Sequence, residues 1–171
     1  GITAGYAPMG AMIVSDKVAE TFQHDDVSFN HGFTWAGHPA AAAAALTVID
    51  IIEREGILDN VQANQDYFHS ELMKLMDLPI VGDVRGTGYF WGVELVRNKE
   101  TKETWQGEEA ERLLRGYISP EMFRRGLICR SDDRGDPVVQ LAPPLISTRE
   151  DIDFMVGTLR EVFTEASKIH V

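Results

Sequence analysis

The sequence has little cysteine, no long apolar run and no excess of basic residues. Its single cysteine, Cys129, excludes an internal disulfide framework and favours a reducing compartment, so a cytoplasmic location is predicted. No apolar run approaches the roughly 18 residues that a membrane-spanning helix needs, so we expect no membrane partner. Lys and Arg number 16 against 27 Asp and Glu, a net charge of −11. Nucleic acid is therefore not an expected partner, because binding it requires a basic patch.

Residues that bind metals or act as nucleophiles show no spacing typical of a site. The five histidines lack the spacing of a zinc site, and the group from His24 to His31 is interpreted as a solvated loop, so no metal is predicted. Cys129 is interpreted as a small buried hydrophobic residue. The lysines all fall on polar helix faces, in loops or in the tail: Lys17, Lys74, Lys99, Lys102 and Lys168. None is a good Schiff-base candidate, so no catalytic residue is assigned within the chain.

The first 55 residues read as the end of a larger domain. The glycine-rich opening has no initiator Met, which favours a fragment. Residues 11–14 predict a strand buried on both faces, and Ser15 or Asp16 predicts the start of a short helix reaching Phe22. A loop over residues 24–37 precedes a long helix that begins at Pro39, runs through six alanines and is stopped by Gly56.

Residues 56–171 predict a second, smaller domain. A helix with apolar positions from Ile57 to Leu75 ends before Pro79. The remaining elements are expected to be two strands with a tight turn or bulge in 81–96, and a helix over 108–125 broken at Ser119-Pro120. Strands at 127–130 and 138–141 on either side of a polar turn, and a final helix after a capping box at 147–150, complete the prediction. The predicted fold is α/β, with a C-terminal α+β domain in which helices cover one face of a sheet.

Two segments offer groups that could bind an anion. The segment from Gly32 to Pro39 places the Thr34 hydroxyl and free amides just before a helix start, where they could bind a phosphate. Alternatively, the Thr34 hydroxyl only forms hydrogen bonds with the loop backbone. Arg130 at a strand end could clamp a carboxylate, or could form a local ion pair with Asp132 or Asp133. The run from Arg85 to Gly92 superficially matches a dinucleotide fingerprint, but its third glycine comes one position late, so a structural bulge is favoured.

Taken in order, four segments resemble the class III aminotransferases, and in particular the ω-amino acid/amine:pyruvate group of fold type I. The resemblance covers essentially the whole chain. The segments are Gly1-Ile2-Thr3-Ala4-Gly5-Tyr6-Ala7-Pro8-Met9-Gly10-Ala11, His31-Gly32-Phe33-Thr34-Trp35-Ala36-Gly37-His38-Pro39, Val84-Arg85-Gly86-Thr87-Gly88 with Trp91-Gly92-Val93-Glu94-Leu95, and Leu141-Ala142-Pro143-Pro144-Leu145.

The resemblance implies pyridoxal 5'-phosphate (PLP) as cofactor and a homodimer or higher oligomer with shared active sites. It places the Schiff-base lysine immediately before Gly1, and Phe33 and Thr34 at the PLP phosphate of the neighbouring subunit. Arg130 matches the family's mobile arginine, which clamps a substrate carboxylate. The implied reaction moves an amino group from an amine or an ω- or β-amino acid to a keto acid such as pyruvate. This chain alone, without the lysine, is expected to be inactive.

Two other functions remain open from the sequence. One keeps the fold and changes the PLP-dependent reaction to decarboxylation, racemisation or aminomutase chemistry. The other is a non-catalytic half that assembles with a separate N-terminal chain.

Overall fold

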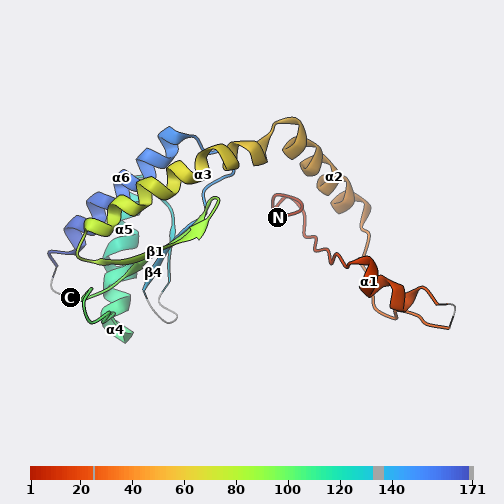
Figure 1. Cartoon of the computed structure of the whole chain (residues 1–171), viewed down its shortest axis with the longest axis horizontal. Coiled ribbons are helices and arrows are strands. Elements are labelled where there is room, and N and C mark those ends of the chain that lie inside the picture. The colour runs from red at the N-terminus through yellow and green to blue at the C-terminus, as the bar shows by residue number, and fades with distance from the viewer. Residues whose placement is uncertain (25, 133–136, 170–171) are drawn as a thin grey trace. The chain divides into compact units, whose positions relative to one another are not determined.

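The computed structural model describes residues 1–24, 26–132 and 137–169, and these belong to two compact units, Gly1–Gly56 and Ile57–Val171 (Figure 1). The fold class is mixed α/β, as predicted. The assignment of residues 1–55 and 56–171 to two domains of a larger protein stays a prediction. Within the described ranges, no helix is long and apolar enough to cross a membrane.

Helices and loops make up the described part of the first unit. It contains α1 (Asp16–Ala19), the 3₁₀ turn η1 (Glu20–Phe22) and α2 (Pro39–Arg54). The predicted short helix is confirmed; Ser15 is its N-cap residue, although its side chain makes no capping hydrogen bond. The start of α2 at Pro39 is also confirmed, and Gly56 follows it with a φ of +61°. That left-handed conformation explains why a glycine stands there.

The strand predicted at residues 11–14 is wrong. The segment forms no strand, and the side chains of Met12 and Ile13 are 74% and 94% exposed. A strand requires a neighbour to accept and donate its backbone hydrogen bonds, and no other strand is present among the described residues of this unit. An apolar run alone therefore does not make a strand, and residues 11–14 pair with no strand among the described residues.

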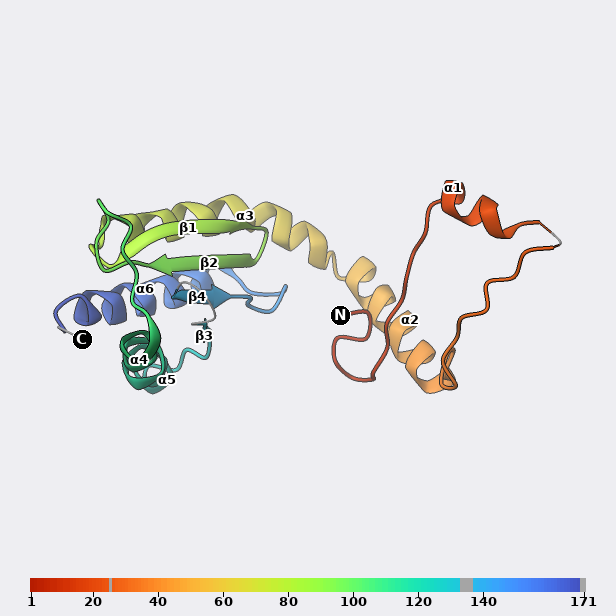
Figure 2. The ribbon, with the colours of Figure 1, turned by 90° about the horizontal axis from the view of Figure 1, so that it is seen from below.

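A four-stranded antiparallel sheet organises the second unit, in the order β1-β2-β4-β3 (Figure 2). Its strands are β1 (Val81–Thr87), β2 (Phe90–Leu95), β3 (Arg130–Asp132) and β4 (Val138–Leu141). The predicted pair of strands in 81–96 is confirmed, and the pairing between β1 and β2 contains the predicted irregularity, between Val81 and Asp83. The turn was predicted over residues 131–137, but Ser131 and Asp132 belong to β3, and residues 133–136 lie outside the described residues.

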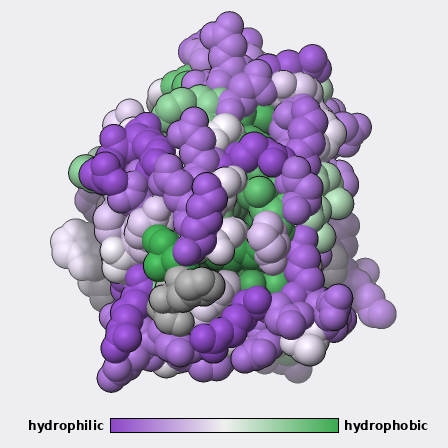
Figure 3. Space-filling view, turned by 90° about the vertical axis from the view of Figure 1, so that its left-hand side faces the viewer, coloured by the Kyte–Doolittle hydropathy of each residue, from purple (hydrophilic) through white to green (hydrophobic). Residues whose placement is uncertain are grey.

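Two long helices, α3 (Ile57–Met73) and α6 (Arg149–Ala166), cover one face of this sheet (Figures 1 and 2). The short 3₁₀ turn η2 (Lys74–Asp77) ends α3 before Pro79, as predicted. Phe68 and Leu72 of α3 and Leu159 of α6 are fully buried with strand residues such as Val93 in one hydrophobic core. The surface seen in Figure 3 is mostly hydrophilic, as the acidic helix faces predict.

A third helical segment packs on α6 and on β3, and the predicted break at Ser119-Pro120 is wrong. Helix α4 (Gly107–Glu111) continues into the π-helix η3 (Arg112–Ile118) and α5 (Ser119–Arg124) without interruption. The Ser119 N–H bonds to the Leu114 carbonyl, five residues back. Pro120 has no N–H to donate, and this wider turn just before it accommodates the missing bond without ending the helix.

Two boundaries also differ from the prediction. Strand β3 begins at Arg130, so residues 127–129 are not part of the sheet. The capping box that starts α6 uses Thr148 and Asp151 rather than the pair one residue earlier. Ser147 is buried and its carbonyl accepts hydrogen bonds from Tyr89 and Asn60. Those contacts hold Ser147 just outside the helix, so its neighbour becomes the cap.

Candidate functional site

Phe33 lies at the end of a series of aromatic contacts along the loop of the first unit. Ring centroids are 5.3 Å apart for Phe22 and Phe29, 5.7 Å for Phe29 and His31, and 5.3 Å for His31 and Phe33, all with edge-to-face geometry. Edge-to-face packing is a favoured arrangement of aromatic rings. These contacts restrict the backbone that leads to Phe33, although its own ring is 76% exposed.

Thr34 begins a tight turn that leads into α2. The Ala36 N–H donates to the Phe33 carbonyl at 2.9 Å, and Gly37 closes the turn with a φ of +68°. Thr34 is exposed, and its hydroxyl forms no side-chain hydrogen bond with another described residue. The alternative in which Thr34 satisfies the loop backbone therefore receives no support from this geometry.

The N-terminus of α2 carries donors that its own structure does not use. His38 is the N-cap residue and provides no side-chain cap, and Pro39 has no N–H. The N–H groups of Ala40 and Ala41 have no carbonyl four residues earlier within the helix, whereas the Ala42 N–H bonds to the His38 carbonyl at 2.9 Å. Such an end bears partial positive charge. With the Thr34 hydroxyl, the segment offers donors suited to a phosphate group.

Arg130 is the first residue of β3 in the second unit, and its neighbours fix the strand there. Ser119 and Ser131 hydroxyls are 3.0 Å apart, and the Cys129 and Met122 sulfur atoms are 3.3 Å apart. Arg130 is exposed. Its alternative role, an ion pair with Asp132 or Asp133, falls on side chains outside the described residues. Phe33 and Thr34 thus belong to one unit and Arg130 to the other.

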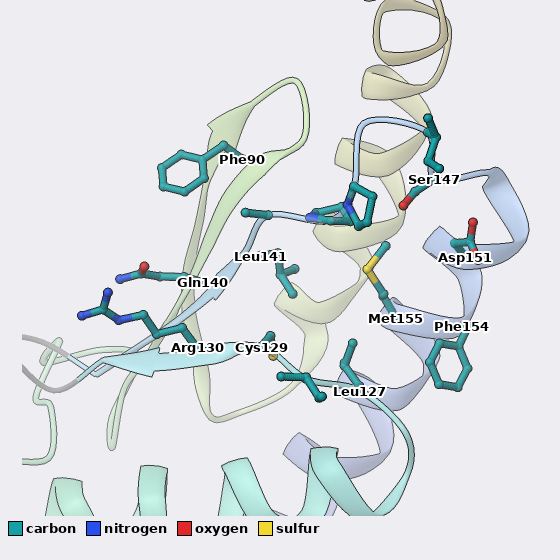
Figure 4. A pocket seen from close by; sticks show the side chains of 15 residues that line it. Phe90, Leu127, Cys129, Arg130, Gln140, Leu141, Ser147, Asp151, Phe154 and Met155 are labelled. Carbon is teal, nitrogen blue, oxygen red and sulfur yellow. The ribbon is translucent and has the colours of Figure 1, made fainter. Parts of the chain in front are cut away.

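Arg130 lies at the edge of an apolar pocket of about 800 Å³ (Figure 4). The walls are mostly hydrophobic and include Phe90, Leu127, Ile128, Leu141, Phe154 and Met155. Polar side chains lie at two ends: Arg130 with Gln140 on the strands, and Ser147 with Asp151 at the start of α6. An apolar pocket with a few polar groups is the usual form of a small-molecule site. The sequence analysis did not identify Gln140. In the sequence it is distinguished only as a polar residue in an otherwise apolar strand.

The glycine-rich run from Arg85 to Gly92 forms the β1–β2 hairpin. Its two strands pair directly, instead of forming the strand–helix unit that a dinucleotide fingerprint requires. A Cβ atom on Gly86 would lie 2.2 Å from the Phe90 carbonyl oxygen, so only glycine fits. The indole N–H of Trp91 donates to the Gly88 carbonyl at 2.8 Å. The run therefore has a structural role, as predicted, but it forms a regularly paired hairpin and the only register shift of β1 and β2 lies outside it, between Val81 and Asp83.

Cys129 is partly buried and packs against the hydrophobic core of the second unit. Burial raises the pKa of its thiol to about 12, because the thiolate would be poorly solvated. A protonated thiol is a poor nucleophile at neutral pH. No group of three or more His, Cys, Asp and Glu is arranged to hold a metal in the part of the chain that the structure describes, which leaves out Asp25, Asp133, Asp136, His170 and the Asp132 side chain.

The profile of the "Aminotransferase class-III" family matches residues 1–163. The chain therefore belongs to the class III aminotransferase family.

Two curated relatives and two solved structures illustrate the similarity. A probable aminotransferase of Mycobacterium tuberculosis is 51% identical over 98% of this chain and 36% of its own length. The putrescine–pyruvate aminotransferase of Pseudomonas aeruginosa is 36% identical over 98% of this chain and 35% of its own. The crystal structure of a thermostable (S)-enantioselective omega-transaminase from Thermomicrobium roseum matches with a TM-score of 0.85 and 38% identity, over 97% of this chain and 36% of that one.

A PLP-bound amine transaminase from an uncultivated Pseudomonas species also has a TM-score of 0.85, at 32% identity over 97% of this chain and 37% of that one. The chain thus spans about a third of the length of the proteins that it matches. Its fold corresponds to one part of fold type I transaminases.

Proposed function

We propose that this chain is part of a PLP-dependent aminotransferase that moves an amino group from an amine or an ω- or β-amino acid to a keto acid such as pyruvate. Family membership supports the reaction class. The single observation that carries the cofactor proposal is the exposed donor set of Thr34 and the uncapped α2 N-terminus. The single cysteine favours the cytoplasm as its location.

The donors of the first unit fit a phosphate group. A phosphate dianion accepts several hydrogen bonds, and the Thr34 hydroxyl with nearby backbone N–H groups provides them next to the positive end of a 16-residue helix. When bound, PLP withdraws electrons from the substrate carbon that loses its proton and carries the amino group between the two substrates. Phe33 and Thr34 would hold the phosphate of the neighbouring subunit's cofactor, so the active sites would be shared within a homodimer or higher oligomer.

Arg130 would orient the substrate. Its guanidinium group can bind a carboxylate through two parallel hydrogen bonds, and the apolar pocket beside it can accept the rest of the molecule while excluding water. The lysine that binds the cofactor covalently is proposed to stand immediately before Gly1, as the resemblance of residues 1–11 to the class III aminotransferases implies.

Alanine formation tests the reaction. The full-length protein that contains this chain, incubated with PLP, pyruvate and an amine donor, is expected to produce alanine in amounts equal to the donor consumed, followed by NMR. Decarboxylation, racemisation or mutase chemistry would consume the donor without transferring nitrogen to pyruvate. Absence of alanine with every amine and amino acid donor tested would reject the proposal.

A pair of substitutions at Thr34 tests the phosphate contact. Thr34→Val removes the hydroxyl at nearly constant volume, whereas Thr34→Ser retains it. A hydrogen bond to a charged group contributes about 1.5–3 kcal/mol, so the valine variant should bind PLP about tenfold to a hundredfold more weakly. The dissociation constant of the serine variant for PLP should remain within about threefold of the wild-type value. Equal dissociation constants for all three proteins would remove Thr34 from the site.

A further inference from the structure

One row of paired residues crosses all four strands on the sheet face that α3 and α6 leave uncovered. The register pairs Arg85 with Gly92, Gly92 with Gln140, and Gln140 with Arg130. Directly paired residues of antiparallel strands point to the same face, with Cβ atoms about 4.5–5.5 Å apart. Figure 4 accordingly shows the Arg130 and Gln140 side chains extending in the same direction from neighbouring strands.

The two arginines of this row differ in their surroundings. The Arg85 guanidinium donates to Asp83 and Glu94, which together neutralise its charge and raise its pKa. Arg130 borders the apolar pocket. Between Arg85 and Gln140, Gly92 has no side chain, and a second cavity of about 410 Å³ lies over it. Gln140 borders both cavities.

Ser147 and Asp151, the polar side chains at the other end of the main pocket, lie away from Arg130. Asp151 accepts hydrogen bonds from the backbone N–H and the hydroxyl of Thr148, and this capping box lowers its pKa. Ser147 is only 6% exposed. In Figure 4 both lie at the end opposite to Arg130. Gln140 is therefore the polar pocket residue best placed to act together with Arg130.

We propose that Gln140 is a specificity-determining residue, whose side-chain amide donates a hydrogen bond to the substrate carboxylate that Arg130 binds. This inference rests on the proposed function and names the feature that separates acidic from uncharged substrates at the same site. A carboxylate offers about four lone-pair positions. A bidentate arginine uses two of them, so one N–H from the neighbouring strand can take a third.

A glutamine suits this position because it adds a donor without adding charge. A glutamate there would pair with Arg130 and compete with the substrate, and an aliphatic residue would leave the carboxylate one hydrogen bond short. An amine without a carboxylate makes no use of the contact. The two classes of substrate should therefore respond differently to substitution of Gln140.

Binding of propionate to the full-length protein tests the contact without turnover. Propionate has a carboxylate and no amino or keto group, and its affinity is obtained from a titration followed by ligand-detected NMR. Gln140→Leu should weaken binding about tenfold and Gln140→Glu more than that. Gln62→Leu makes the same change on an exposed position of α3 and should leave the affinity unchanged. Equal affinity in wild type and Gln140→Leu would overturn the inference.

Kinetics separate substrate specificity from a general structural effect. For Gln140→Leu, kcat/KM should fall about tenfold with β-alanine and stay unchanged with propylamine, in which a methyl group replaces the carboxylate. An equal fall for both donors would indicate a positioning or structural role and overturn the inference. The wild-type protein could produce no alanine while Gln140→Leu still weakens propionate binding. In that case the proposed reaction is wrong and the carboxylate site stands.

Discussion

Substitution of Gly86 should destabilise the second unit strongly, whereas the same change at Gly92 should not. A Cβ atom on Gly86 would lie 2.2 Å from the Phe90 carbonyl oxygen and 2.7 Å from the Trp91 Cα atom. Both neighbours are backbone of the paired strand, so relief requires β2 to move. At Gly92 the nearest atom is Val138 Cγ1 at 3.2 Å, a side chain that needs to shift only slightly.

The size of the effect follows from two opposing contributions. Overpacking of a close contact costs about 1–3 kcal/mol, and the backbone contacts of Gly86 place it at the upper end. Alanine also restricts the unfolded chain more than glycine and recovers about 0.5–1 kcal/mol. We therefore expect Gly86→Ala to lower the free energy of unfolding by about 2–3 kcal/mol, and Gly92→Ala to stay within about 1 kcal/mol of wild type.

Urea unfolding of the chain, followed by tryptophan fluorescence, measures both values. Trp91 and Trp105 are 6% and 8% exposed and lie in the core, so their emission reports on this unit. A stability of Gly86→Ala within about 0.5 kcal/mol of wild type would refute the steric argument, since such a change is typical of an unconstrained surface site. Equal destabilisation by both variants would refute it as well.

Three further predictions concern the second unit. Phe68→Ala should cost about 3–5 kcal/mol in the same urea assay, because the ring is fully buried. Tyr67 donates to Asp153, which raises its pKa to about 12, so absorbance titration should give a midpoint near 12 that falls on Asp153→Asn. The pKa of Tyr67 is higher in the folded than in the unfolded chain. The hydrogen bond to Asp153 therefore stabilises the fold below pH ~10, and this contribution is lost as the pH rises towards ~12. Cys129 should react with a disulfide reagent at pH 8 roughly a thousandfold more slowly in the folded chain than in urea, since its thiolate is scarce.

Local patterns predicted the elements whose partners lie within the same unit. The apolar spacing of α3 and α6, the start of α2 at Pro39 and the glycine-rich hairpin are all confirmed. The strand at residues 11–14 was wrong, because a strand also requires a neighbour that local sequence does not reveal. The break at Ser119-Pro120 was wrong, because a π-turn can accommodate proline inside a helix.

The candidate site could be predicted only in part. The resemblance to a family identified Phe33, Thr34 and Arg130, and the structure adds the uncapped N-terminus of α2 and the pocket at Arg130. Gln140 could not be recognised from the sequence, because its proximity to Arg130 depends on the register between β3 and β4. Register is a property of paired strands, and the turn that joins these two is long and polar.

The most direct test of the account is complementation between two defective subunits of the full-length protein. One variant carries Thr34→Asp, which repels the phosphate, and the other lacks the lysine proposed before Gly1. If Thr34 serves the neighbouring subunit's cofactor, each mixed dimer regains one intact site, and random mixing should restore about a quarter of wild-type activity. Activity no higher than that of the separate variants would contradict the shared site.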